Sequence, residues 1–434
     1  MPEATTDSGE VLLPAPTAAS PDGQLHWRAT LAAAWVAQLL AMAGFSFVMP
    51  FIPFYLRDLG VRNEKLVALW SGVIVTASGI SMTLFAPFWG VMADRYGRKA
   101  MVQRAMFGGA VILSLMGLAG NVYHLLTLRI LQGVLTGTVS ASVALVSSVT
   151  PQRRLGSSLG AMQAAVFLGS AAGPWLGGFC ADRLGYRLPF PVAGLMLAVA
   201  GILVLFMVRE DFERRAARAQ KGTLGQVLSL PGFTGVLTLV LMVNFASTVV
   251  APVFPLFVEQ IMHTKTRVAT VTGLILAVGG LVAGLSSLVT GRLSDRIGHG
   301  RMLVGCTAVS GVLSGLLAAA NNIGQLFALR VGFGLSSGGT GPAMNALIAR
   351  SVPNSSYGRA YGLTASASSL GFALGPVLGG AIASAYGLRA PFVATAVLLV
   401  LVAVLAGARI IPALDSQACG RRLVACESEA AKGK

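Results

Sequence analysis

The stretch "GVMADRYGRK", Gly90–Lys99, lies between two long apolar segments and carries one acid, three bases and two glycines. The stretch "GRLSDRIGHGR", Gly291–Arg301, repeats this pattern 201 residues later. Glycine adopts backbone conformations that other residues avoid, so Gly90 and Gly97 are expected to let the chain reverse tightly. A charged reversal that recurs at a fixed distance predicts two copies of one structural unit.

The composition is typical of a membrane protein. Of the 434 residues, 55% are hydrophobic and 11% are charged, whereas a soluble domain carries about 25% charged residues. Crossing a hydrocarbon core about 30 Å thick takes about 20 apolar residues in a helix. Strand-like alternation is absent, which argues against a barrel. The sequence therefore predicts an all-α polytopic membrane protein with twelve transmembrane helices, at 28–56, 67–89, 100–120, 122–148, 156–180, 188–208, 232–260, 268–290, 302–320, 324–349, 357–384 and 390–412.

Three further pairs of segments recur with nearly the same spacing, each pair in equivalent predicted spans. They are "LRILQGV" (Leu128–Val134) with "LRVGFGL" (Leu329–Leu335), "GSAAGPWLGG" (Gly169–Gly178) with "GFALGPVLGG" (Gly371–Gly380), and "MPFIPFY" (Met49–Tyr55) with "APVFPLF" (Ala251–Phe257). Parallel six-helix repeats around a central site are a transporter plan. We expect two pseudo-symmetric six-helix halves at 28–208 and 232–412, joined by a charged cytoplasmic linker at 209–231. Cytoplasmic tails are expected at 1–27 and 413–434.

The net charge of +16 is distributed unevenly over the predicted topology. With an even number of spans both termini share one side, which holds 22 Lys and Arg, whereas the opposite connections hold eight. Because an excess of Lys and Arg marks the cytoplasmic side, both termini are expected there, and the basic charge indicates no nucleic-acid partner. The tail at 1–27 lacks a signal-peptide pattern and has a disordered composition. The four cysteines have neither metal-ligand nor disulfide spacing.

These motifs carry a resemblance to a known family. The sequence resembles the major facilitator superfamily over about residues 28–412, and within it the twelve-span drug:proton antiporters, especially the MdtG-like multidrug efflux proteins. The resemblance rests on "GVMADRYGRK", "LRILQG", "GSAAGPWLGG" and "GFSFVMPFIPFYLRDLG". It implies a multi-pass transporter in a bacterial inner membrane, and the motifs do not identify the cargo.

The charged stretch is interpreted as a conformational latch between the halves. The resemblance implies that Asp94 meets the start of the eleventh span, near Ser356–Arg359, when the protein is open outward. There a carboxylate would accept backbone N–H groups and face the positive end of the helix dipole. The alternative is an ordinary surface loop with mixed charges. Residues assigned to the latch are Gly90, Asp94, Arg95, Gly97, Arg98, Asp295 and Arg296.

The glycine-rich fifth span is expected to pack closely and to bend. Gly169 and Gly173, spaced i,i+4, would leave a groove for another helix backbone, and Pro174 would remove one intrahelical hydrogen bond. Gly375 and Pro376 repeat the arrangement in the eleventh span. We interpret these residues as a paired hinge or seal at the interface, with generic glycine-rich packing as the alternative.

Arg129 is the most informative single residue. It lies about seven residues into the fourth span, roughly 10 Å below the surface at about 1.5 Å per residue. Because a charge at this depth costs at least about 2.5–3.5 kcal/mol, it is expected to face the protein interior and to serve a function. Snorkelling to the interface is the alternative. Candidates for coupling transport to an ion gradient are Arg129, Gln132, Arg330, Glu259 and Asp58.

A substrate cavity is expected between the halves. Met and Phe surfaces with a few hydrogen-bonding groups adapt to varied apolar ligands. Core packing is the alternative for any single member. The substrate-binding candidates are Gln38, Met42, Phe45, Met49, Thr136, Asn244, Ser247, Phe254, Phe333 and Ser337.

The predicted function is secondary export of amphipathic drugs, driven by a proton gradient. No phosphate-binding GxxxxGK[ST] is present, so neither ATP nor another cofactor is expected. No metal-ligand, Ser/His/Asp or paired-carboxylate cluster lies at depth, which disfavours an enzyme. All sixteen acids fall in tails, connections or span ends, so the carboxylate that would carry a proton is not identified. The alternatives are an exporter or uniporter of a metabolite such as a sugar or siderophore, and a transport-dead sensor or lipid-interacting membrane protein.

Overall fold

The structure is a computed structural model that describes residues 21–151, 154–208, 230, 232–264, 266–352 and 357–412. The description omits the side chains of residues 21–26, 94, 140, 148, 350 and 357–359. Most of the predicted tails and nearly all of the predicted linker lie outside the described residues. Every regular element among the described residues is a helix, and ten of these helices are long and apolar enough to cross a membrane.

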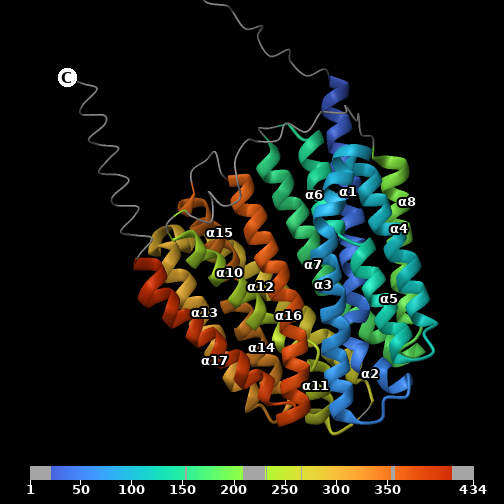
Figure 1. Cartoon of the computed structure of the whole chain (residues 1–434), viewed down its shortest axis with the longest axis vertical. Helices are drawn as coiled ribbons and strands as arrows, with labels where there is room; N and C mark the ends of the chain where they lie inside the picture. The colour runs from blue at the N-terminus through green and yellow to red at the C-terminus, as the bar shows by residue number, and fades with distance from the viewer. Residues whose placement is uncertain are drawn as a thin grey trace, which may run out of the picture.

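The helices form two halves that lie side by side, blue to green and yellow to red in Figure 1. The first half contains α1 (Pro21–Val48), η1 (Met49–Phe51), α2 (Ile52–Asp58), α3 (Glu64–Tyr96), α4 (Arg98–Gly117), α5 (Val122–Leu135), α6 (Thr138–Val149), α7 (Leu155–Leu184) and α8 (Pro189–Met207). The second contains α10 (Phe233–Val249), α11 (Phe254–Met262), α12 (Val268–Ile297), α13 (His299–Ala318), α14 (Ile323–Ser337), α15 (Thr340–Ser351), α16 (Tyr357–Tyr386), α17 (Ala390–Leu405) and η4 (Ala406–Ile410). We call the end where α1 begins the termini end, and the end with α2 and α11 the far end (Figure 1).

The first and seventh predicted spans are each interrupted at their double proline. Pro53 and Pro255 lie in the first turn of α2 and of α11, where a missing backbone N–H costs no hydrogen bond. The repeated "MPFIPFY" and "APVFPLF" segments therefore build equivalent breaks at the far end.

The fourth and tenth predicted spans are also each two helices rather than one. The break between α5 and α6 follows from Thr136, which is extended, and Gly137, whose φ of 135° is open to glycine. The Trp89 indole N–H donates 2.6 Å to the Val134 carbonyl in the last turn of α5, so this helix end is partly satisfied. In the second half the chain breaks at Gly338 and Gly339, between α14 and α15.

The opening motif is more helical than the sequence suggests. α3 continues to Tyr96 and α4 begins at Arg98, so the reversal is confined to Gly97, with a φ of 94°. Its repeat Gly298 has a φ of 101° between α12 and α13. The expectation that Gly90 contributes to the reversal is wrong: Gly90 lies inside α3, and a Cβ there would meet no atom within 4 Å.

The two halves touch through glycines that face backbone of the other half. A Cβ at Gly178 on α7 would collide with the Ala269 carbonyl of α12, and one at Gly273 on α12 with the Pro174 carbonyl of α7. The same contacts recur between α3 and α16, where Gly380 faces Ala68 and Gly72 faces Pro376. The Val377 N–H also donates to Thr76 Oγ1 across this seam at 3.0 Å.

The residues of the predicted hinge make two kinds of contact, one within each half and one between the halves. Gly169 and Gly173 press α7 against Leu39 and Ala43 of α1, within the first half. Gly371 and Gly375 do the same between α16 and α10 in the second half. The carbonyls of Pro174 and Pro376, by contrast, face the other half. The motif therefore contributes both to packing within a half and, through the two proline carbonyls, to the seam between halves. Whether it acts as a hinge or a seal stays a prediction.

The halves separate toward the termini end. Along α7 and α12, a Cβ at Gly280 would lie 3.6 Å from Ala171 and one at Gly284 3.9 Å from Phe167. Nearer the termini end, a Cβ at Gly160 would meet nothing within 4 Å. The described contacts of the α3–α16 seam likewise lie in its far-end part, at residues 68–79 and 373–380.

We predict that Gly178→Ala weakens the seam, because its Cβ would meet the Ala269 carbonyl and force α7 away from α12. Overpacking of this kind costs about 1–3 kcal/mol, so Tm in detergent should fall by several degrees. Gly160→Ala on the same helix is the control, since its Cβ would meet no atom within 4 Å. Equal Tm values for both variants would contradict the backbone contact at Gly178.

Candidate functional site

Arg129 is buried in the first half and lacks an acidic partner. Its residue is 1% exposed, Nη1 donates 2.9 Å to Gln132 Oε1, and the same nitrogen lies 3.2 Å from Met49 Sδ. Nε and Nη2 have no hydrogen-bond partner among the described residues. The structure thus brings Arg129 and Gln132 together as the sequence indicated, one turn apart on α5. None of the acids among the described residues forms an ion pair with Arg129.

Arg330, the repeat counterpart of Arg129 on α14, has different neighbours. Its Cζ lies 5.2 Å from the ring centroid of Phe254 and 5.2 Å from that of Phe333. Phe254 is buried and Phe333 half-buried. Arg330 therefore lies against two of the predicted cavity residues, which come from α11 and α14.

The predicted cavity face of helix α1 is not uniform. Gln38 is 1% exposed, and no described residue forms a hydrogen bond with its side-chain amide. Met42 packs at the Gly169 contact with α7, whereas the ring of Phe45 lies near Gly109 of α4. Met49 contacts a coupling residue, since its Sδ lies 3.2 Å from Arg129 Nη1. The α1 candidates thus face several neighbours rather than one shared cavity.

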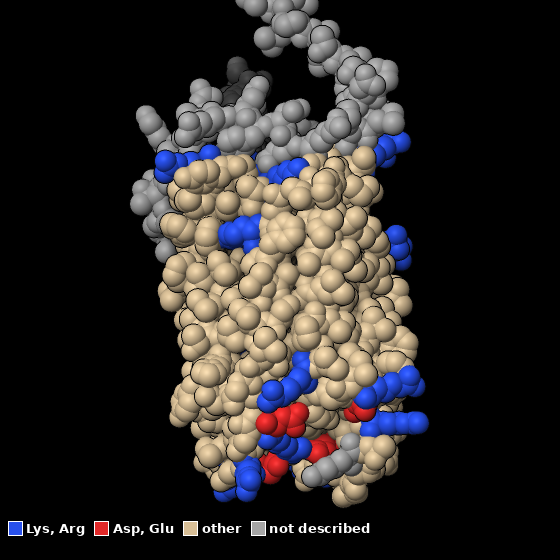
Figure 2. All heavy atoms as spheres, turned by 90° about the vertical axis from the view of Figure 1, so that its right-hand side faces the viewer, with Lys and Arg blue, Asp and Glu red and all other residues tan. Residues whose placement is uncertain are grey.

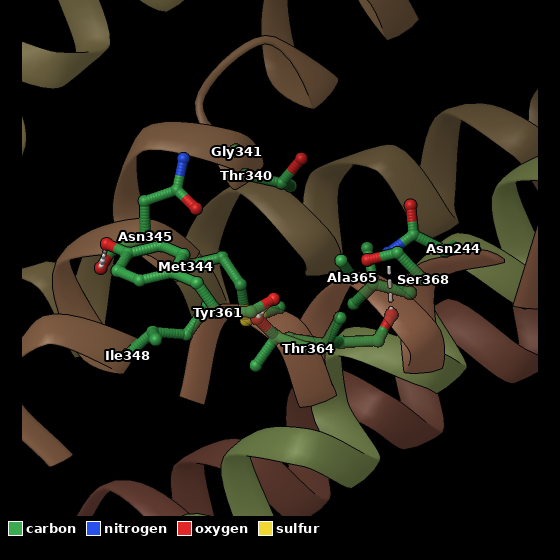
Figure 3. Close-up of a pocket in the computed structure, with 12 residues that line it drawn as sticks. Asn244, Thr340, Gly341, Met344, Asn345, Ile348, Tyr361, Thr364, Ala365 and Ser368 are labelled. Carbon is green, nitrogen blue, oxygen red and sulfur yellow. Dashed lines mark hydrogen bonds between the residues drawn. The ribbon is translucent and has the colours of Figure 1, made fainter. Parts of the chain in front are cut away.

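A recess of about 320 Å³ lies in the second half, lined by α10, α15 and α16 (Figure 3). Asn244, a predicted substrate residue, belongs to it and donates 3.3 Å to Ser368 Oγ. The rest of the lining mixes apolar side chains with neutral hydrogen-bonding groups: Val240, Val243, Thr340, Gly341, Met344, Asn345, Ile348, Tyr361, Thr364 and Ala365. None of these described lining residues carries a formal charge, so this part of the recess suits the uncharged part of an amphipathic molecule.

Of the other cavity candidates, Thr136 lies beside Phe45, since both side chains come within 3.5 Å of a Cβ placed at Gly109. Thr136 donates 2.7 Å to the Gln132 carbonyl, and Ser337 donates 3.3 Å to the Gly334 carbonyl, so both bond their own helices. Ser247 is exposed and donates 2.7 Å to the Val243 carbonyl. Their hydroxyls are thus already used within a turn, which is common for Ser and Thr in membrane helices.

An ion pair crosses between the halves at the far end. Arg57 Nη1 of α2 lies 2.7 Å from Glu259 Oε2 of α11, and Arg57 Nη2 lies 2.7 Å from Glu64 Oε2. Arg57 and Glu259 are 202 residues apart, the spacing of the repeat at this point. Residues at equivalent positions meet beside a pseudo-two-fold axis, so this pair lies where the two halves converge.

Asp182 adds a second polar contact across the far end. From the last turn of α7, its Oδ2 accepts the Thr270 N–H at 2.7 Å and the Thr270 hydroxyl at 2.6 Å. Its Oδ1 accepts the Ala269 N–H at 3.3 Å. These N–H groups belong to the first turn of α12, so Asp182 caps a helix of the other half and faces its positive dipole end.

The phenol of Tyr186 is affected by the charges of the acids at the far end. The pKa of its phenol is raised to about 12, chiefly by burial and further by the charges of Asp182, Glu259 and Asp58, while the Arg57 charge acts in the opposite direction. Figure 2 shows acidic and basic side chains intermingled toward this lower end of the first-half face, whereas the upper part shows basic ones. Glu259 and Asp58, two coupling candidates, therefore gather at the far end rather than at Arg129.

The predicted latch residues lie at the termini end. The side chains of Asp94 and of residues 357–359 are outside the described part, as is Ser356. Arg95 is exposed, with its Cζ 5.4 Å from the Tyr96 ring centroid, and Arg98 is half-buried. In the second copy, Asp295 is exposed and lies 3.9 Å from His299 one turn later, while Arg296 is exposed.

Sequence reasoning missed Arg57, Asp182 and Thr270 as contacts between halves. The contact of Arg57 could have been predicted, because the repeat offset places opposite charges at Arg57 and Glu259. For Asp182 no comparable signal exists, since its repeat counterpart is Ser384 and Thr270 corresponds to Leu69.

Comparison with known proteins extends this picture. The family model of the Major Facilitator Superfamily matches residues 34–271 and 236–417. Multidrug resistance protein MdtG of Citrobacter koseri is 34% identical over 378 residues, which cover 86% of this chain and 93% of that protein. Multi-drug resistance efflux pump PmrA of Streptococcus pneumoniae is 34% identical over 377 residues, covering 86% and 94%.

Solved structures share the fold. The chain resembles a mutant of the nucleoside transporter NupG with a TM-score of 0.76 and 10% identity, covering 87% of this chain and 99% of that one. The chain also resembles a bacterial homolog of the human lysosomal transporter Spinster in an inward-facing and occupied conformation. The TM-score is 0.74 and the identity 15%, and the match covers 88% of this chain and 96% of that one. At these identities the likeness concerns the fold alone.

We predict that Glu259→Gln favours separation of the halves at the far end, because the Arg57 pair between them loses its charge. A hydrogen bond to a charged group contributes about 1.5–3 kcal/mol, so the open-to-closed ratio at the far end should rise about tenfold or more. Distances between spin labels on α2 and α11 measure this ratio. Glu64→Gln is the control, because it removes a partner of Arg57 within one half.

Exchange of the two charges, Arg57→Glu with Glu259→Arg, should restore the closed population. If Glu259→Gln and Glu64→Gln leave the same distance distribution as the wild type, the pair between halves has no influence on the far end.

Proposed function

Because the chain belongs to the major facilitator superfamily, a family of transporters rather than enzymes, we propose that it exports amphipathic drugs or similar small molecules from bacteria. On this proposal the protein lies in the cytoplasmic membrane with both termini inside, since 22 Lys and Arg belong to the termini side and eight to the other. The names of two relatives, a multidrug resistance protein and an efflux pump, favour this cargo class.

The observation that carries the proposal is the unequal contact between the halves. They touch at the far end, through the glycine seam, the Arg57–Glu259 pair and the Asp182 cap, and they part toward the termini end. Cargo enters from the termini end and reaches the recess beside Asn244. Rocking of the halves then closes that end and opens the far end, which is alternating access.

Proton exchange supplies the energy on this proposal. No acid lies at mid-depth in the sequence, so Arg129 acts as a fixed positive charge that orders a proton-carrying water with its unpartnered Nε and Nη2. Glu259 and Asp58 are the acids that exchange protons with the far side. Arg330 is the second fixed charge at depth.

Transport by purified protein in proteoliposomes with an imposed pH gradient tests this function. Wild type should move fluorescent amphipaths uphill, and collapse of the gradient should stop the movement. Arg129→Ala should lose uphill transport while binding cargo in part. Arg129→Lys should be impaired because it keeps the charge and loses the planar set of donors. Full pH-driven transport by Arg129→Ala would exclude the coupling role.

We further propose that Asp94 latches α3 to the start of α16 in the outward-open state. Asp94→Asn keeps the size and removes the charge, so transport should fall several-fold with normal membrane insertion. Asp295→Asn is the matched variant of the second copy and should have less effect, because His299 and Gly300 replace the basic residues there. Unimpaired transport by both variants would contradict the latch.

A further inference from the structure

Arg129 and Arg330 occupy equivalent positions in the two halves but have unequal partners. A shift of 201 residues takes Arg129 to Arg330 and Gln132 to Phe333. In the first half the Gln132 amide oxygen accepts a hydrogen bond from Arg129 at 2.9 Å. A phenylalanine ring offers no such acceptor. The repeat has therefore kept the charge and replaced its neutral partner with an aromatic ring.

The guanidinium of Arg330 lies near two aromatic rings, and no described residue uses its donors. Phe254 and Phe333 both lie 5.2 Å from its Cζ, within the range of cation–π contacts. Across the described residues, Arg330 makes no hydrogen bond and no ion pair. Gly279 makes room for it on α12, since a Cβ there would lie 3.1 Å from Arg330 Cγ. The side chain is half-buried, which leaves part of it accessible.

A cation at this depth calls for a negative partner, and none of the acids among the described residues pairs with Arg330. All sixteen acids lie in tails, connections or helix ends. An unpaired charge inside a membrane protein is costly and marks a functional site, and guanidinium donors bind carboxylate and phosphate groups with good geometry. Two flanking rings add an apolar surface beside those donors.

We propose that Arg330, Phe254 and Phe333 form an anion subsite that takes the carboxylate, phosphonate or sulfonate group of amphipathic cargo. This inference rests on the proposed export function and narrows its cargo to amphipathic anions. The acidic group meets the guanidinium while the adjoining apolar part contacts the two rings. The uncharged recess around Asn244 lies farther toward the termini end, because Thr340 follows Arg330 along the same broken span. Arg129, already bonded to Gln132, is not part of this subsite.

A matched pair of ligands tests the proposal. One fluorescent amphipath is used as its free carboxylate and as its methyl ester, which differ in charge and little in shape. Affinities are measured on the full-length protein in nanodiscs. The carboxylate should bind wild type about tenfold tighter than the ester, as a charge-assisted hydrogen bond of about 1.5–3 kcal/mol implies. Arg330→Gln should abolish this preference and leave the Kd of the ester unchanged.

A second pair of variants keeps the arginine in place. Phe333→Gln supplies the acceptor that the first half has, so it should occupy the Arg330 donors and weaken carboxylate binding several-fold. Phe333→Leu removes the ring without adding an acceptor and should keep most of the preference. Equal affinities of the two ligands for wild type, or a preference that persists in Arg330→Gln, would overturn the anion subsite.

Efflux of both ligands from proteoliposomes separates this inference from the proposed function. Export of the ester and the carboxylate with equal affinity rejects the subsite and leaves export standing. Failure to export either ligand rejects the proposed function, and the subsite is then decided by the comparison of Kd values.

Discussion

This structure depends on direct contact between helix backbones, which is possible where glycine, with no side chain, lies at the contact. Gly178 and Gly273 bring α7 and α12 together, and Gly72 and Gly380 do the same for α3 and α16. In lipid no hydrophobic force drives helices together, so close packing and hydrogen bonds hold the interface. Because these four glycines lie in the far-end part of their helices, the halves are joined at that end and part at the other.

The polar contacts at the far end are placed by this seam. The repeat brings Arg57 and Glu259 to positions related by the pseudo-two-fold axis, where opposite charges pair and like charges would repel. Asp182 reaches the first turn of α12 because Gly178, one turn earlier on α7, lets that helix approach Ala269. One cluster of buried apolar residues at this end includes members of both halves, such as Ala181 and Ala269. The ion pair and the cap add contacts that depend on charge.

Much of the fold could be predicted from the sequence, because apolar length and the repeated motifs report directly on membrane helices and on their pairing. The breaks in the fourth and tenth spans could not, since Gly137 and the glycine pair at Gly338 resemble the packing glycines elsewhere in the chain. Arg129 with Gln132 was predictable from helical spacing. The Asp182–Thr270 contact was not, because it joins two segments that no motif or periodicity relates.

The repeat also explains where the chemistry of the two halves differs. Positions that build the seam are the same in both copies, with Gly178 and Gly380 facing Ala269 and Ala68. Positions beside the seam differ: Asp182 corresponds to Ser384, and Gln132 corresponds to Phe333. A backbone contact tolerates no added atom, so both copies must keep it, whereas a polar side chain is needed only where it meets a partner. Arg330 is the exception, because the second copy keeps the charge without a counterpart of Gln132. A charge at depth that pairs with no described residue is where we place the partner from outside the chain.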